Sequence, residues 1–124
     1  MENEVAHSVI GAALEVHRAL GPGLLETAYG TCLCRELALM GLVYETEVPI
    51  TVQYKGEVIS VAYRADLLVE HCVLVELKAV DRVSPVHKAQ LLTYLRMTGR
   101  RLGILINFNS ILLKDGIFRL VNGL

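Results

Sequence analysis

The segment VLVELKAV, Val73 to Val80, decides how the fold is interpreted, because it combines a buried strand with two charged residues. Six of its eight residues are apolar, which predicts a strand that is covered on both faces. Glu76 and Lys78 lie two positions apart within it. Side chains at positions i and i+2 of a strand point the same way, so we expect the carboxylate and the ammonium to share one face.

The turn before this strand sets the partner of each charged residue. The segment EHC, residues 70–72, joins two strands, and a symmetric hairpin around it pairs residues whose numbers sum to 142. This register places Asp66 opposite Glu76 and Arg64 opposite Lys78. Two opposed carboxylates, with β-carbons roughly 5 Å apart, repel by roughly 3 kcal/mol at an effective dielectric near 20. An apolar hairpin needs compensation for that repulsion.

Two remedies could relieve the repulsion between the carboxylates. One acid could keep a proton, or a cation could lie between the two acids. Magnesium or manganese suits the second remedy, because these hard cations take one or two protein carboxylates and keep several waters. Lys78 lies roughly 7 Å along the strand from Glu76, so an ordinary ion pair between them is a further interpretation. These residues alone leave the alternatives open.

Hydrophobic periodicity and turn signals predict an α/β sandwich. Apolar residues at three- and four-residue spacing indicate the first helix, and Ser84 followed by Pro85 is a typical helix start. The strand after that last helix follows a crossover connection, so we expect it to run parallel to its neighbour. The expected elements are helices over 3–19, 24–41 and 85–99, strands over 43–54, 58–69, 73–80 and 101–108, and a closing hairpin around 114–116.

Length and composition predict one domain, residues 1–124, in a reduced cytoplasmic protein. No apolar run approaches the eighteen or so residues that span a bilayer, and the N-terminal MENEVAHSV is acidic, unlike a signal peptide. Cys32, Cys34 and Cys72 are odd in number and match no zinc or disulfide spacing. We therefore expect no membrane partner and no disulfide framework.

Charge and apolar content suggest two kinds of partner. Residues 1–76 carry a net charge of −7 and residues 77–124 carry +6. A basic second half could supply a phosphate-binding surface, or it could simply be solvated. Hydrophobic residues make up 53% of the chain, and the first helix has a wide apolar face over residues 5–20. That face is a candidate dimer interface, so a homodimer is expected.

Several motifs together resemble the PD-(D/E)xK nuclease superfamily, in which an Asp ends one strand and an acid-x-Lys motif lies on the next. Asp66 followed by the ELK tripeptide 76–78 is similar to that signature, although residue 65 is Ala where the family often has proline. QLLTY, residues 90–94, resembles the QxxxY motif of the exonuclease-like branch. GLLETAY, residues 23–29, resembles the motif that names the small bacterial and archaeal GxxExxY family, which is assigned to the same superfamily.

The resemblance runs from about His7 to Asn122 and implies a restriction-endonuclease-like core, with a mixed central sheet flanked by helices. It also implies a Mg²⁺ or Mn²⁺ site. Asp66 and Glu76 would be ligands of that metal, with the backbone carbonyl of Leu77 as a third. Glu26 would reach the metal directly or through water, although an acid in the first turn of a helix can also simply stabilise the helix end.

The same resemblance assigns roles to residues around the metal. Lys78 would orient or deprotonate the attacking water and stabilise the charge that develops on phosphate. Gln90 would hold Lys78 or a phosphate, or would be an ordinary amide on a solvated helix face. Tyr29, on the same helix face as Glu26, would hydrogen-bond to it or simply pack. Tyr94 shares the helix face of Gln90 and is a supporting residue.

The function implied is a divalent-metal-dependent nuclease that hydrolyses phosphodiester bonds in DNA or RNA. Two alternatives remain: a non-catalytic nucleic-acid-binding or assembly module that retains the fold, and an enzyme acting on a small phosphorylated substrate. Glu26, Asp66, Glu76, Lys78 and Gln90 form an intact set. The intact set favours the nuclease, because drift in a non-catalytic module would have removed some members.

Overall fold

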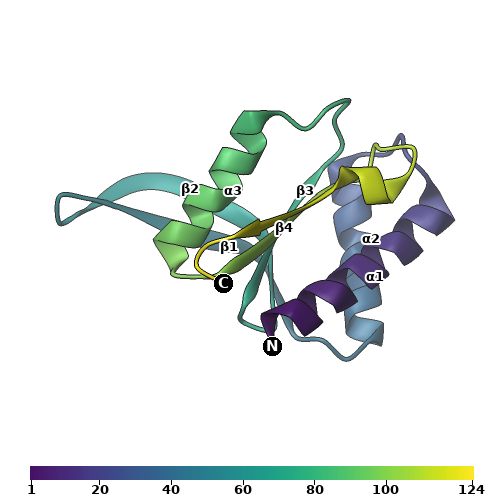
Figure 1. The fold of residues 1–124 in the computed structure, drawn as a ribbon, viewed down its shortest axis with the longest axis horizontal. Coiled ribbons are helices and arrows are strands. Elements are labelled where there is room, and N and C mark those ends of the chain that lie inside the picture. The colour runs from purple at the N-terminus through teal and green to yellow at the C-terminus, as the bar shows by residue number, and fades with distance from the viewer.

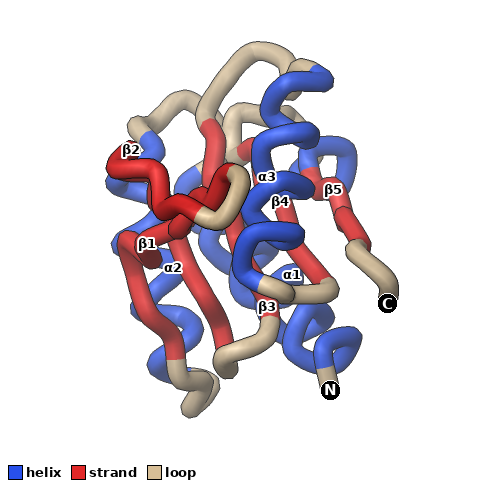
Figure 2. Tube along the Cα trace, turned by 90° about the vertical axis from the view of Figure 1, so that its left-hand side faces the viewer, coloured by secondary structure: helices blue, strands red, loops and turns tan.

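The computed structural model describes residues 1–60 and 63–124, and its helices and strands form an α/β sandwich (Figure 1, Figure 2). The elements are α1 (Glu2–Leu20), α2 (Glu26–Leu39), β1 (Tyr44–Tyr54), β2 (Glu57–Val69), β3 (Val73–Lys78), α3 (Pro85–Thr98), β4 (Leu102–Asn107), the 3-10 helix η1 (Leu113–Gly116) and β5 (Ile117–Val121). In the described part of the chain the strands form one mixed sheet in the order β1-β2-β3-β4-β5. The expected fold class is confirmed.

Each face of the sheet has its own apolar core. The first core packs α1 and α2 against the sheet, and the second packs α3 against the other face. Val5, Val9 and Val16 of α1 are buried in the first core, so the apolar face of this helix is already covered by its own chain. The expectation that this face forms a dimer interface is therefore wrong.

The central strands follow the predicted pattern. β3 is buried at Val73 to Leu77, and it pairs in parallel with β4, which is buried along its whole length. Burial of both faces explains why these strands are almost continuously apolar. Ser84 caps α3 by accepting a hydrogen bond from the His87 N–H, and Gly99 ends the helix in a left-handed conformation.

Two expected segments differ in the structure. β3 ends at Lys78 rather than at residue 80, because the Asn107 side chain binds both the N–H and the C=O of Val80 at 3.0 and 2.8 Å. The closing segment is not a separate hairpin. It forms η1 and then β5, which pairs antiparallel with β4. Leu113 enters the core beside α1, and this burial draws the segment back onto the sheet.

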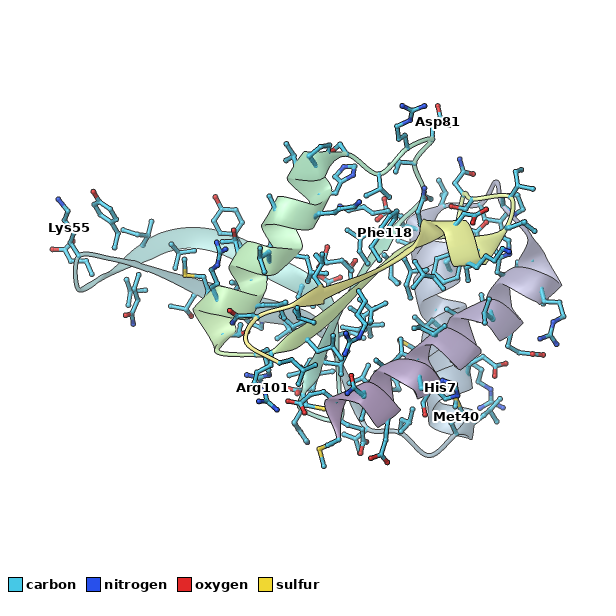
Figure 3. The ribbon with its side chains drawn as sticks, in the orientation of Figure 1. His7, Met40, Lys55, Asp81, Arg101 and Phe118 are labelled. Carbon is cyan, nitrogen blue, oxygen red and sulfur yellow. The ribbon has the colours of Figure 1, made fainter. Side chains whose placement is uncertain are left out.

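The hairpin of β1 and β2 extends beyond the rest of the sheet, with Lys55 at its far end (Figure 1, Figure 3). Lys55 and Gly56 both have positive φ, as a tight two-residue hairpin turn requires. No helix in the described residues is long and apolar enough to cross a membrane. The carboxyl ends of β3 and β4 lie side by side, and the candidate site is built there.

Candidate functional site

Asp66 lies where the alternation of faces along β2 breaks. Leu67 packs in the core of α1 and α2 and Leu68 packs in the core of α3, but Ala65 also packs in the core of α3. Glu47, at the same level of the neighbouring strand β1, has φ of 51°, which is uncommon for a residue other than glycine. The regular order of faces is therefore interrupted in both strands at the level of Asp66.

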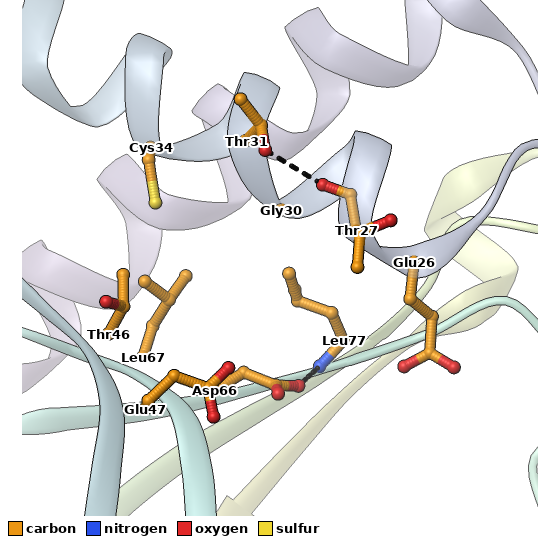
Figure 4. Close-up of a pocket in the computed structure, with 10 residues that line it drawn as sticks. All are labelled: Glu26, Thr27, Gly30, Thr31, Cys34, Thr46, Glu47, Asp66, Leu67 and Leu77. Atoms are coloured by element: carbon orange, nitrogen blue, oxygen red, sulfur yellow. Dashed lines mark hydrogen bonds between the residues drawn. The ribbon is translucent and has the colours of Figure 1, made fainter.

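Asp66 lines a pocket of about 320 Å³ between the sheet and α2 (Figure 4). Glu26, the first residue of α2, and Glu47 line the same pocket, together with Leu77. Among the described residues that line this pocket, three are carboxylates and none is Lys, Arg or His. We call it the acidic pocket, and its charge favours a cation over an anion.

Asp66 and Glu76 are interlocked through the backbone. The regular pairing of β2 with β3 ends at Leu67 and Val75, in the register that the EHC turn predicts. Beyond this point the Asp66 N–H donates to Glu76 Oε1 at 2.9 Å, and the Leu77 N–H donates to Asp66 Oδ2 at 2.7 Å. The carboxylates replace the main-chain bonds of the ladder, so the predicted proximity of the two acids is confirmed.

Burial makes this pair of acids difficult to ionise together. Glu76 is only 6% exposed, and burial, followed by the charge of Asp66, raises the Glu76 pKa to about 7. Burial also raises the pKa of Asp66. Glu76 therefore keeps its proton to a higher pH than an exposed glutamate does. A proton on one acid is one of the two remedies expected from the sequence, and a bound cation would replace it.

Lys78 lies at the carboxyl end of β3 with its side chain partly exposed. Its charge opposes the rise in pKa of both Asp66 and Glu76, so the ammonium lies within electrostatic range of both acids. Among the ion pairs of the described residues, none joins Lys78 to Glu76. The interpretation of these two residues as a simple ion pair is therefore not supported.

Tyr29 fixes the loop that leads to Glu26. Its hydroxyl donates to the Gly21 carbonyl at 2.5 Å and accepts from the Leu24 N–H at 3.1 Å. Its ring stacks on Phe108, with centroids 4.5 Å apart and planes at 6°. Tyr29 thus does more than pack, and its hydrogen bonds go to the loop backbone rather than to Glu26.

We expect Tyr29→Phe to lower the free energy of unfolding by about 1–3 kcal/mol, because it leaves a partly buried N–H and C=O without their partner while keeping the stacked ring. Chemical denaturation measures this difference. Tyr54→Phe, in the exposed hairpin, is the matched control and should unfold like the wild type. Equal stability of the Tyr29 variant would contradict the anchoring role.

Gln90 and Tyr94 lie on the other side of the sheet. They line a second pocket of about 290 Å³ between α3 and the hairpin, together with Ile50, Val52 and Tyr63. Burial raises the pKa of Tyr94, and the charge of Glu76 adds to that rise. The structure therefore places the expected residues on two sides of the sheet, with Asp66 and Glu26 at the acidic pocket and Gln90 and Tyr94 beside α3.

The carboxylates of the site are the candidate ligands of the expected metal. Within residues 1–60 and 63–124, no three His, Cys, Asp or Glu side chains converge closely enough to hold a metal ion. The carboxylates of Asp66 and Glu76 are held by backbone N–H groups of neighbouring strands, and carboxylates are the hard oxygen donors that Mg²⁺ and Mn²⁺ prefer. Glu26 lines the same pocket as Asp66. The residues fit a cation that has few protein ligands and several waters.

Two residues of the site were not singled out in the sequence. Glu47 reaches Asp66 through a shift of register, since Val52 pairs with Ile59 near the turn but Ile50 pairs with Tyr63 beyond it. An irregularity of this kind leaves no clear signal in the sequence. Asn107 is 3% exposed. An amide at the end of an apolar strand indicates a buried hydrogen-bonding role, because buried polar groups need partners.

Comparison with known proteins gives a family and a fold. Over residues 3–120 the chain matches the family described as "PD-(D/E)XK nuclease superfamily". The crystal structure of SSO0001 is similar in fold, with 24% sequence identity and a TM-score of 0.57 over 79% of this chain. The match covers 50% of the SSO0001 chain, so this chain spans about half its length.

The second structural match is more distant. The alkaline exonuclease LHK-Exo from Laribacter hongkongensis is 15% identical, with a TM-score of 0.47 over 97% of this chain and 80% of its own. No curated protein matches the chain significantly. The family match extends over nearly all of the residues, including both interlocked acids and Lys78. This chain therefore belongs to the PD-(D/E)XK nuclease superfamily.

Proposed function

We propose that this protein is a divalent-metal-dependent nuclease that hydrolyses phosphodiester bonds in DNA or RNA. The observation that carries the proposal is the interlocked pair Asp66 and Glu76, with Lys78 on the same strand as Glu76. A buried and a partly buried acid that repel each other are unfavourable in a merely structural hairpin. Membership of a nuclease superfamily supports a nuclease-type function.

Asp66 and Glu76 would hold Mg²⁺ or Mn²⁺, with the Leu77 carbonyl as a third ligand and Glu26 acting through water. The acidic pocket and the raised pKa values of both interlocked acids support this assignment. When bound, the cation supplies positive charge that offsets the two carboxylates and polarises a phosphoryl oxygen.

The remaining residues would position the substrate and its attacking water. Lys78 would orient the water through its ammonium, and its charge would stabilise the negative charge that develops on phosphate. Gln90 exposes its amide on α3 and would bind a phosphate oxygen. Tyr29 would hold the start of α2, and with it Glu26, in place. Tyr94 would support the site from α3.

A non-catalytic nucleic-acid-binding module is the second candidate. Gln90 lines a different pocket from Asp66 and Glu26, and this separation is the observation in its favour. Incubation of the protein with labelled single- and double-stranded DNA and RNA distinguishes the two functions.

We expect cleavage with Mg²⁺ or Mn²⁺, none with EDTA, and none by Asp66→Asn. Asp115→Asn, an exposed change of the same type in η1, is the control and should cut like the wild type. The nuclease proposal would be contradicted if none of the four substrates were cut with either metal. Equal cutting in EDTA would also contradict it.

The finer assignments are also proposals. Gly23, Glu26 and Tyr29 supply the GxxExxY motif and support membership of that family. A cytoplasmic location is proposed for a domain spanning residues 1–124. A homodimer is proposed because Leu25 and Ile111 are 76% and 80% exposed. Light scattering at tens of micromolar should give the dimer mass, and a monomer mass would refute the dimer.

A further inference from the structure

A groove lies between α3 and the hairpin of β1 and β2. It is on the face of the sheet opposite the acidic pocket, because α3 and α2 cover opposite faces. Gln90, Tyr94 and Met97 face this groove from α3, at the spacing that places side chains on one helical stripe. Tyr63 of β2 faces it from the hairpin, and its ring lies 6.4 Å from that of Tyr94 at an angle of 55°. We call this surface, completed by Ile50, Val52 and Thr93, the hairpin groove.

The lining of the hairpin groove is largely apolar and is open to solvent. Tyr63 and Met97 are each 41% exposed. Farther out on the hairpin, Tyr54 is 63% exposed and carries the Lys55 ammonium 5.3 Å from its ring centroid. Exposed aromatic faces beside a cation are the components with which proteins stack unpaired bases.

The two sides of the sheet differ in charge. The acidic pocket is lined by three carboxylates. In contrast, α3 contains no acid, and the sequence has no Asp or Glu between Arg82 and Lys114. Arg96 is exposed on α3, roughly 100° around the helix from the groove residue Met97, and adds positive charge to this side of the molecule. A polyanion is therefore repelled from the side of α2 and accepted on the side of α3.

Strand β3, which carries Glu76 and Lys78, contributes to the cores on both faces of the sheet. Leu74 packs in the core of α3, whereas Val75 and Leu77 pack in the core of α1 and α2. By alternation along β3, Glu76 and Lys78 therefore turn toward the face that α3 covers, while the Glu76 carboxylate still accepts from the N–H of Asp66, which lines the acidic pocket. A nucleic-acid strand lying in the groove would therefore lie on the face of the sheet toward which these two residues turn.

We infer that single-stranded nucleic acid binds along the hairpin groove, with bases stacked on Tyr63 and phosphates attracted by the charge of Arg96, while cations enter through the acidic pocket. This inference rests on the proposed function and names its substrate form and path. A duplex hides the faces of its bases, so it would leave the apolar lining of the groove without a partner. Unpaired bases offer a π-face to the tyrosine irrespective of sequence.

The test is binding of a fluorescent oligothymidylate of about 15 nucleotides, measured by anisotropy in EDTA so that the strand stays intact. Tyr63→Leu keeps an apolar side chain but removes the aromatic face, and it should raise Kd about 5- to 100-fold. Tyr63→Phe restores the face and should bind like the wild type. Arg96→Glu should also raise Kd and reduce its salt dependence. The matched charge reversal Arg35→Glu, exposed on α2, should have no effect.

The outcomes separate the groove from the nuclease proposal. Wild-type affinity in both Tyr63→Leu and Arg96→Glu, an equal loss in Arg35→Glu, or tighter binding of a duplex of the same length would overturn the groove. If the protein cuts nucleic acid but shows any of these results, the nuclease proposal stands and the groove proposal fails. If the protein cuts nothing but its binding of single strands depends on Tyr63 and Arg96, the groove proposal stands and the nuclease proposal fails.

Discussion

Lys78→Ala is expected to reduce nucleic-acid cleavage by about 10²- to 10⁴-fold, the usual loss when a positioned catalytic group is removed. The physical reason is a division of roles at the end of β3. Asp66 and Glu76 hold the cation, whereas the Lys78 ammonium acts on the water and on the charge that develops on phosphate. The measurement is the initial cleavage rate at saturating Mn²⁺, compared with that of the wild type.

Stability separates this catalytic role from a structural one. No ion pair joins Lys78 to Glu76 among the described residues, and the Lys78 side chain is partly exposed, so the variant should melt close to the wild type. Manganese binding should largely survive. Lys114→Ala, on the exposed surface of η1, is the matched control. A Lys78→Ala variant that cuts at the wild-type rate would rule out the assigned role.

Glu76→Gln is expected to stabilise the metal-free protein at alkaline pH by about 3 kcal/mol. The folded protein raises the pKa of Glu76 from 4.5 to about 7, so it binds this proton more tightly than the unfolded chain does. The associated stability is present below pH 4.5 and is lost as pH rises through 7. Glutamine resembles the protonated acid and keeps an oxygen that can accept from the Asp66 N–H.

Urea denaturation in EDTA at several pH values measures this effect. The stability gain of Glu76→Gln over the wild type should be small at pH 4.5 and should grow until the pH is well above 7. Glu57→Gln, in the exposed hairpin turn, should show no such pH dependence. If Glu76→Gln were less stable than the wild type at pH 9, the unfavourable ionisation of the pair would be refuted.

Short-range sequence signals, namely a turn and a motif, were sufficient to predict the part of the site around β3. The EHC turn sets the register of β2 with β3, and the observed pairs, such as Leu68 with Leu74, follow it. Short turns fix register because the side-chain period of a strand is two residues. The motif around Glu76 and Lys78 then lies where the sequence predicts, at the end of a buried strand.

Long-range packing decided the features that the sequence did not reveal. Glu47 reaches the level of Asp66 only because the pairing of β1 with β2 shifts within the hairpin. The apolar face of α1 was expected to meet a second copy, but it covers the sheet of its own chain. Periodicity identifies an apolar face and leaves its partner undetermined. Likewise, helical spacing placed Gln90 beside Tyr94 without showing that both face the hairpin.

The most direct test of the central claim is calorimetric titration of the protein with manganese, since the claim is that Asp66 and Glu76 share one divalent cation. The wild type should give saturable binding, and Asp66→Asn should weaken it by at least about 10-fold, because even the outer partners of metal ligands typically contribute that much. Asp115→Asn should bind like the wild type. Equal manganese affinity in the wild type and Asp66→Asn would contradict the account.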